Sequence, residues 1–217
     1  MNRKFNSTLF ILAVLFFLAG CATKTPLLYD HPQVNLPSTP NLKIAVTRPE
    51  DERQPNKDVD KMWATDPTND IKNVIIKELQ CTGLFKNVID LGSKEGDEIQ
   101  DITIKLISSI KVLEWEIPNL EEQEGNMFAI SLLTGGIGGL IYGNGETDFY
   151  GKATLKICIK NEQTDETLLD KEYSSRAEEK MARLKTDSYE ERSKIIGCAV
   201  KQIMEEFKND VKQVMQQ

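Results

Sequence analysis

The chain has 217 residues, with 27 basic and 34 acidic side chains and a formal net charge of −7. It contains no block of clustered lysines and arginines, which argues against a nucleic-acid partner, because a phosphate backbone is bound by basic side chains gathered on one face. His31 is the only histidine. A Ser-His-Asp or Cys-His catalytic arrangement would have to use it, and a zinc site built from several histidines is excluded.

The first 21 residues have the three parts of an export signal. Arg3 and Lys4 give a positive start, residues 9–18 form an apolar run, and small residues precede a cysteine in the motif at residues 18–21. The apolar run is too short to span a membrane. We therefore expect residues 1–20 to be a leader that is removed from the mature protein.

The motif Leu18-Ala19-Gly20-Cys21 resembles the lipobox of bacterial lipoproteins. The resemblance implies cleavage after Gly20 and lipidation of Cys21, with two or three acyl chains such as palmitate anchoring the protein to a membrane. In that family an Asp directly after the cysteine favours the inner membrane. Here Ala22 and Thr23 follow, which implies the outer membrane, with the domain facing the periplasm.

Removal of the leader takes away two basic and no acidic side chains, so the mature chain of 197 residues has 25 basic and 34 acidic side chains and a net charge of −9. Residues 21–40 contain Pro26, Pro32, Pro37 and Pro40 and show no helical or strand period. We expect an extended tether there, with His31 as a solvated residue. At about 3.1 Å per residue, twenty residues reach roughly 60 Å. Residues 41–217 suit one folded domain.

The folded part is expected to begin near Asn41. Leu42, Ile44 and Val46 alternate with other residues as in a half-buried strand, until Pro49 ends it.

A first helix is predicted after this strand. Asp66 followed by Pro67 is typical of a helix N-cap and first turn, and Thr82-Gly83 is typical of a helix end. Between them lies an apolar stripe made of Ile71, Val74, Ile75 and Leu79. Residues 88–91 follow as a short second strand.

Two long strands are predicted at residues 102–115 and 149–160. The first places one set of apolar residues on one face: Ile102, Ile104, Leu106, Ile110 and Val112. In the second, the odd positions from Phe149 to Ile159 are apolar or small and most even positions are polar. One face of this strand is therefore expected to pack in the core and the other to face solvent. Residues 161–167 are expected to form a hairpin loop that returns as a strand over residues 168–175.

The last segment predicts an amphipathic helix. Residues 186–188 offer N-caps, and Glu190 and Glu191 lie in the first turn. Apolar residues then recur at spacings of three and four, namely Ile196, Val200, Ile203, Phe207, Val211 and Val214.

This order of elements predicts an α+β fold: a mostly antiparallel sheet of about four to five strands with two helices packed on one face. From Leu42 onward the order, with the turn from Leu79 to Phe85 through Gly83, is similar to small α/β domains of envelope lipoproteins in the curli-secretion and TolB amino-terminal group. The resemblance implies architecture only.

Residues 125–145 contain no charged side chain and seven glycines, of which Gly135, Gly139 and Gly143 are spaced by four. In one helix these three would share a face and allow close approach of a membrane segment or of a second copy. The other interpretation is a mobile connection, in which five apolar side chains pack on the edge of the domain. Those side chains are Met127, Phe128, Ile130, Leu132 and Leu133.

Three cysteines remain besides the acylated one: Cys81, Cys158 and Cys198. At most one internal disulfide can form among them. Cys81 and Cys198, on the two predicted helices, make the best pair, and three thiols are the alternative.

The pattern favours a non-enzymatic, lipid-anchored structural or accessory subunit of a cell-envelope assembly or transport system, without cofactor or metal. Its envelope partners would bind at the sheet edge or at residues 125–145. Two alternatives stay open: an oligomeric membrane-active or pore-type lipoprotein that uses residues 125–145, and a periplasmic hydrolase. Paired carboxylates and a Ser-Lys pair remain open for the hydrolase, since nothing in the sequence singles out such a pair.

Overall fold

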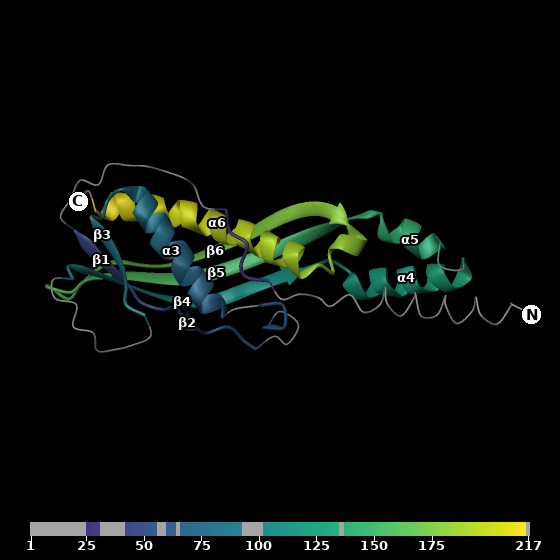
Figure 1. The fold of residues 1–217 in the computed structure, drawn as a ribbon, viewed down its shortest axis with the longest axis horizontal. Helices are drawn as coiled ribbons and strands as arrows, with labels where there is room; N and C mark the ends of the chain where they lie inside the picture. The colour runs from purple at the N-terminus through teal and green to yellow at the C-terminus, as the bar shows by residue number, and fades with distance from the viewer. Residues whose placement is uncertain are drawn as a thin grey trace, which may run out of the picture.

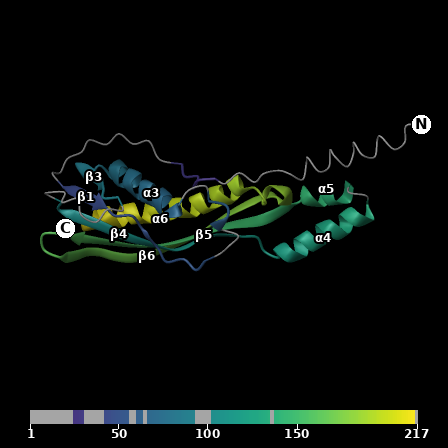
Figure 2. The ribbon, with the colours of Figure 1, turned by 60° about the horizontal axis from the view of Figure 1, so that its bottom comes forward.

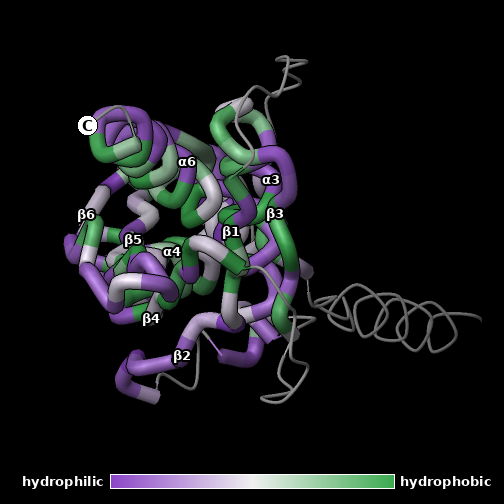
Figure 3. The backbone as a smooth tube through the Cα atoms, turned by 90° about the vertical axis from the view of Figure 1, so that its left-hand side faces the viewer, coloured by the Kyte–Doolittle hydropathy of each residue, from purple (hydrophilic) through white to green (hydrophobic). Residues whose placement is uncertain are grey.

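The computed structural model describes residues 25–30, 42–55, 60–63, 66–92, 102–134 and 137–215. Gly20, Cys21, His31 and Gly135 lie outside these ranges. The described residues form an α+β fold in which α3 (Pro67–Thr82) and α6 (Tyr189–Val214) cover one face of a sheet (Figures 1 and 3). Two further helices, α4 (Leu120–Leu133) and α5 (Ile137–Gly143), extend beyond one end of that sheet (Figure 2).

The sheet is mixed, with the order β3-β1-β4-β5-β6 and β2 paired to β4. The strands are β1 (Lys43–Val46), β2 (Glu50–Asp51), β3 (Asn87–Asp90), β4 (Ile104–Glu116), β5 (Glu146–Asn161) and β6 (Glu166–Ala182). The α+β class is confirmed, and the two long ladders, β4–β5 and β5–β6, are antiparallel. β1, however, is parallel to both β3 and β4. A helix between two paired strands returns the chain to the same end, which makes β1 and β3 parallel.

β1 differs from the half-buried strand that its alternation predicted. Ile44, Ala45 and Val46 are all fully buried. Because successive side chains of a strand point to opposite faces, the burial of all three shows that both faces of β1 are covered, as is usual for parallel strands.

β4 contains a register shift that the sequence did not predict. The pairing with β5 is irregular between Ile110 and Val112, and after that point Leu113 is the buried residue while Val112 is only half-buried. An extra residue in a strand moves the following side chains to the other face. The prediction that Val112 shares a face with Ile110 is therefore wrong.

The ends of α3 and the alternation of β5 match their predictions, whereas β6 is longer than the strand predicted over residues 168–175 and Ser188 makes no side-chain capping bond at the start of α6. The Asp66 carboxylate accepts a hydrogen bond from the Thr68 N–H at 2.9 Å, and Gly83 ends α3 with φ 67°. The odd positions of β5 from Phe149 to Ile159 are buried, and so is most of the predicted stripe of α6. Val214, the last residue of that stripe, is half-buried.

Residues 25–30, which we call the strap, lie along α6 and also contact α3. The Leu28 N–H donates to Ser193 Oγ at 3.0 Å, and that hydroxyl donates to the Pro26 carbonyl at 2.6 Å. From α3, Asp70 accepts from the Leu27 N–H at 3.1 Å. Only 8 % of Leu27 is exposed. The described part of the predicted tether is therefore packed on the domain.

A buried ionic cluster fixes the far part of the strap. The Tyr29 hydroxyl donates to Glu78 Oε1 at 2.6 Å, and Lys208 Nζ lies 2.9 Å from Glu78 Oε2. Burial raises the pKa of the Tyr29 phenol, and the bond to Glu78 raises it further. The tyrosine therefore stays a hydrogen-bond donor to a carboxylate that is itself fully buried.

Gly197 is required for this packing. A Cβ atom at Gly197 would stand 1.8 Å from the Leu28 carbonyl oxygen. We expect Gly197→Ala to force the strap away and to lower the free energy of unfolding by about 1–3 kcal/mol, the usual cost of overpacking. Denaturant unfolding of residues 21–217, followed by Trp fluorescence, measures this change.

Gly125→Ala is the matched control, because Gly125 is also helical and an added Cβ there meets nothing within 4 Å. Alanine in a helix is more favourable than glycine by about 0.5–1 kcal/mol. Equal stability of the Gly197→Ala and Gly125→Ala proteins would show that the strap does not contribute to folding.

Candidate interaction site: the apolar helical arm

Helices α4 and α5 form an arm that connects β4 to β5 at one end of the sheet (Figures 1 and 2). The chain turns into the arm through Asn119, which has the left-handed φ of 56°. α4 ends at Leu133 and α5 begins at Ile137. Gly135 lies outside the described residues, so a shared contact through Gly135, Gly139 and Gly143 stays a prediction.

The base of the arm is held by side-chain hydrogen bonds. Gln123 Nε2 of α4 donates to the Pro118 carbonyl at 2.8 Å and to Thr147 Oγ1 of β5 at 3.0 Å. Arg183 follows β6 in the short helix η1 (Arg183–Lys185), and its Nη1 donates to the Tyr142 carbonyl at 3.0 Å. Its guanidinium also lies 4.5 Å from the centroid of the Tyr142 ring. The arm is therefore fixed to the end of the hairpin.

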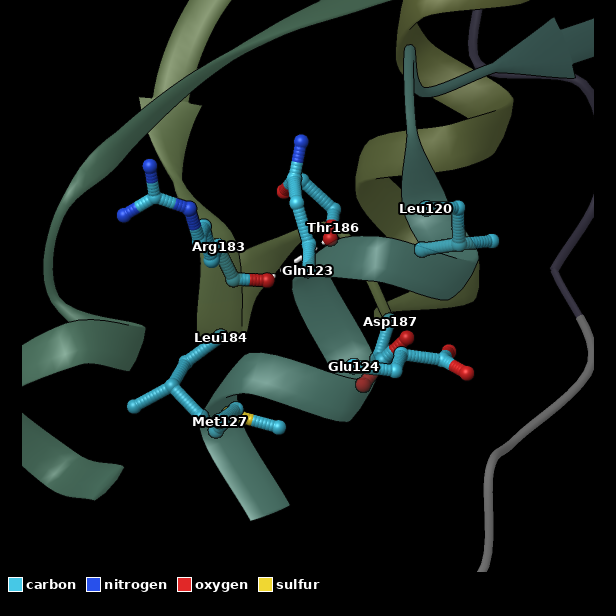
Figure 4. Close-up of a pocket in the computed structure, with 8 residues that line it drawn as sticks. All are labelled: Leu120, Gln123, Glu124, Met127, Arg183, Leu184, Thr186 and Asp187. Carbon is cyan, nitrogen blue, oxygen red and sulfur yellow. Dashed lines mark hydrogen bonds between the residues drawn. The ribbon is translucent and has the colours of Figure 1, made fainter. Parts of the chain in front are cut away.

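A small cavity of about 30 Å³ lies between α4 and the chain after β6. Figure 4 shows Met127 of α4 and Leu184 of η1 beside each other, with Gln123 and Arg183 at the other side. Ligand pockets commonly measure about 300–1,000 Å³. This cavity is of the size of about one water molecule, so it belongs to the joint of the arm.

Gly138 brings the two helices of the arm together. Its N–H donates to Thr134 Oγ1 at 2.7 Å, and a Cβ added to it would stand 2.6 Å from Ile130 Cγ2. Gly138 was not predicted as a contact residue, because the regular spacing of the glycines pointed to its neighbour Gly139. The usable signal was Thr134, a hydroxyl near the end of the apolar run with a Gly-Gly pair four residues later.

Gly143 contacts the chain's own η1. A Cβ added there would stand 2.7 Å from Leu184 Cγ, and Gly143 is buried. The absence of a side chain at Gly143 thus allows the base of the arm to pack closely against η1.

The outer part of the arm exposes large apolar side chains. Those with the highest exposed fractions among the described residues are Phe128 (67 %), Leu132 (68 %), Leu133 (86 %), Ile137 (68 %) and Ile141 (71 %). Each leaves unused about 1–2 kcal/mol that burial would provide. An exposed apolar cluster of this kind is typical of an interaction site.

The exposed side chains agree only in part with the interpretation that residues 125–145 are a connection packed on the edge of the domain. Met127 and Ile130 are half-buried, as that interpretation expects. Phe128, Leu132 and Leu133 point into solvent instead. The segment is also helical over most of its length, so it presents its apolar side chains at defined positions.

The open face of the sheet is the other candidate surface. It has a shallow hollow of about 350 Å³ lined by residues of β4, β5 and β6, among them Lys152 and Arg176. Charges on this face pair with one another, as Lys156 with Asp170 at 3.5 Å, and the Arg176 guanidinium stacks 3.8 Å from the Tyr150 ring centroid. At the edge, β6 alternates buried or half-buried residues with mostly charged exposed ones, which blunts the edge against strand addition.

In the described ranges, no helix has the combination of length and apolar character needed to cross a membrane. The described residues also contain no group of three or more His, Cys, Asp or Glu side chains arranged to hold a metal ion. No disulfide joins Cys81, Cys158 and Cys198 in the structure, and the Cys198 side chain is exposed.

No protein-family model matches the sequence, and no curated protein matches it. Solved structures with a similar fold include a DUF330 protein from Xanthomonas campestris, with 11% identity, coverage of 90% of this chain and 100% of that chain, and a TM-score of 0.54. A hypothetical protein from Chlamydia trachomatis has 6% identity, coverage of 81% and 98%, and a TM-score of 0.50.

A lipoprotein from Neisseria meningitidis has 12% identity, coverage of 77% of this chain and 99% of that chain, and a TM-score of 0.33. We draw nothing from an overlay of that strength. The two stronger similarities show the fold alone: this chain shares its α+β architecture with bacterial proteins.

Gly138→Val is expected to separate α5 from α4, because the valine methyl groups would overlap Ile130 and Thr134. Overpacking of this size costs about 1–3 kcal/mol, so amide hydrogens of residues 137–143 should exchange about tenfold faster or more. Hydrogen–deuterium exchange with mass spectrometry measures this rate. Ala129→Val is the control, since Ala129 is exposed on the same arm. Equal exchange in both variants would contradict the close contact at Gly138.

Proposed function

We propose that this chain is a non-enzymatic lipoprotein of the bacterial outer membrane, anchored through Cys21, whose periplasmic domain is a structural or accessory subunit of an envelope assembly or transport system. The observation that carries this proposal is the arm. Five large apolar side chains at its outer part are exposed, and its base is fixed by Gln123 and Arg183. Such an arm presents an apolar surface to something outside the domain.

The leader supports the anchoring part of the proposal. Residues 1–20 and Cys21 have the pattern of a lipoprotein signal. The strap starts at Thr25, only four residues after Cys21, and it packs on α6. The anchor would therefore be attached to the folded domain by a very short link.

A binding function agrees better with the described surface than catalysis does. The cavity at the arm's base has room for about one water molecule, and the charges on the open sheet face, such as Lys180 and Asp148 at 4.0 Å, pair with each other. A solvated surface has this arrangement. In the pore-type alternative the same arm would be covered by the membrane or by other copies of the chain, instead of by a different envelope protein.

Cys21→Ser should abolish lipidation, because serine has no thiol to accept the diacylglyceryl group, and should leave an uncleaved precursor. Labelling of growing cells with a radioactive fatty acid, followed by gel electrophoresis, tests this. Ala22→Asp is the paired variant: it keeps the thiol, so it should be lipidated normally but move to the inner-membrane fraction. Unchanged labelling of the Cys21→Ser protein would remove the lipoprotein assignment.

The role of the arm is tested with a triple variant, Phe128→Ser, Leu132→Ser and Leu133→Ser. Because these side chains are exposed, the thermal unfolding temperature should stay within about 2–4 °C of the parent's. In a strain whose own copy is deleted, the triple variant should fail to restore growth in the presence of detergent. Ile107→Ser, on the open sheet face, is the control and should restore it. Full restoration by the triple variant would contradict a function for the arm.

A further inference from the structure

We propose that the apolar outer part of the arm is covered by the lipid bilayer that holds the acyl chains of Cys21, and that the strap keeps the arm at that depth. The arm would lie at the boundary between headgroups and acyl chains, without crossing the membrane. This inference rests on the lipid anchor of the proposed function and adds the identity of the arm's partner.

The length of the chain before the strap limits where the membrane can be. Thr25 is bound to the domain, since its hydroxyl donates to the Tyr189 carbonyl at 3.1 Å and its N–H donates to the Met62 carbonyl at 3.0 Å. An extended chain spans at most about 3.6 Å per residue. The Cα atom of Cys21 can therefore lie no more than about 14 Å from that of Thr25, and the bilayer surface must come similarly close.

The direction of the strap places the anchor at the same end of the domain as the arm. The strap runs along α6 in the direction of that helix, with Thr25 beside Tyr189, Leu28 beside Gly197 and Asp30 near Lys201. Its amino end is thus at the start of α6. Three residues separate the start of α6 from η1, which contacts the base of the arm (Figure 1).

The distribution of side chains on the arm fits a lipid surface better than a protein groove. In α4, Phe128 and Leu132 are four residues apart and share one face, Leu133 lies about 100° further round the helix, and Ile130 faces α5, so apolar side chains occur on more than one side of α4. A helix that docks in a groove shows one apolar stripe, whereas a helix that is apolar on all sides is found in a protein core or in a membrane. Ile137 and Ile141 extend the same surface over α5.

Charges mark how deep the arm would lie. Residues 125–145 carry none, whereas the exposed carboxylates of Glu122 and Glu124 lie in the first turns of α4. Tyr142 and Arg183 are stacked at the base, and aromatic and basic side chains are common at the headgroup level. Two copies of this acidic chain would also repel each other, which disfavours a second copy as the partner.

The experiment uses the full lipidated protein in vesicles of phosphatidylethanolamine and phosphatidylglycerol, after mass spectrometry has verified the acyl chains. Cys81, Cys158 and Cys198 are replaced by alanine, and one new cysteine carries the fluorophore NBD. Leu132→Cys places the label on the arm. Asp165→Cys, in the turn between β5 and β6, is the control position. Nitroxide groups on lipid headgroups report contact with the bilayer, and aqueous iodide reports contact with water.

We expect the label at position 132 to shift its emission to the blue and to be quenched at least about twofold more by the lipid nitroxide than the label at position 165. A label at 132 that iodide quenches as strongly as at 165 would overturn the proposal. So would a label shielded from both quenchers in a protein that cross-links to itself, because a second copy would then cover the arm. Neither result would contradict the proposed function, which only the lipidation and growth tests can overturn.

The strap is tested in the same vesicles with Gly197→Ala, which displaces Leu28. Release of the strap lengthens the link to the anchor, so lipid quenching at position 132 should fall to about half or less. Lys201→Ala is the matched control on α6, since it removes only an exposed pair with Asp30 at 3.9 Å. Equal quenching in the two variants would overturn the role of the strap.

Discussion

The close packing of the strap on α6 is the constraint on which the arrangement of this molecule depends. Gly197 lets the Leu28 carbonyl approach the helix, and the Ser193 hydroxyl both donates to and accepts from the strap. Asp70 of α3 bonds to the same segment. Two helices of the core therefore hold six residues near the amino end of the chain. Any group attached just before Thr25 takes its position from the core rather than from a free tether.

The long hairpin positions the arm in a comparable way. β5 and β6 are paired over nearly their whole length, and η1 directly follows β6. Arg183 and Leu184 of η1 contact the arm at Tyr142 and Gly143. The arm is thus fixed to the same sheet that α6 covers. Its exposed side chains and the strap keep a constant relation, which a flexible connection would not provide.

Local signals were predictable from the sequence, and contacts between distant residues were not. The Asp66 cap and Gly83 defined α3, and strict alternation defined β5, because each signal lies within a few neighbouring residues. The strap was predicted to be part of a tether, because the residue to which it is hydrogen-bonded, Ser193, lies about 165 positions further along the chain. The absence of charge over residues 125–145 pointed to the candidate site. The two helices of that site meet at Gly138 and Ile130, and the even spacing of Gly135, Gly139 and Gly143 did not point to this contact.

Charge explains why this domain would need both an acyl anchor and an apolar arm. Without residues 1–20 the chain would have a net charge of −9, so anionic lipid headgroups would repel the domain rather than hold it against the membrane. Acyl chains on one cysteine fix a single point, about which a domain can still turn. A second contact must then come from apolar side chains, because basic ones are lacking on the arm. Phe128, Leu132 and Ile141 supply such a contact at no cost to the core, since none of them is buried in it. Two contacts at one end, joined by the strap, would define how the rest of the domain faces the periplasm.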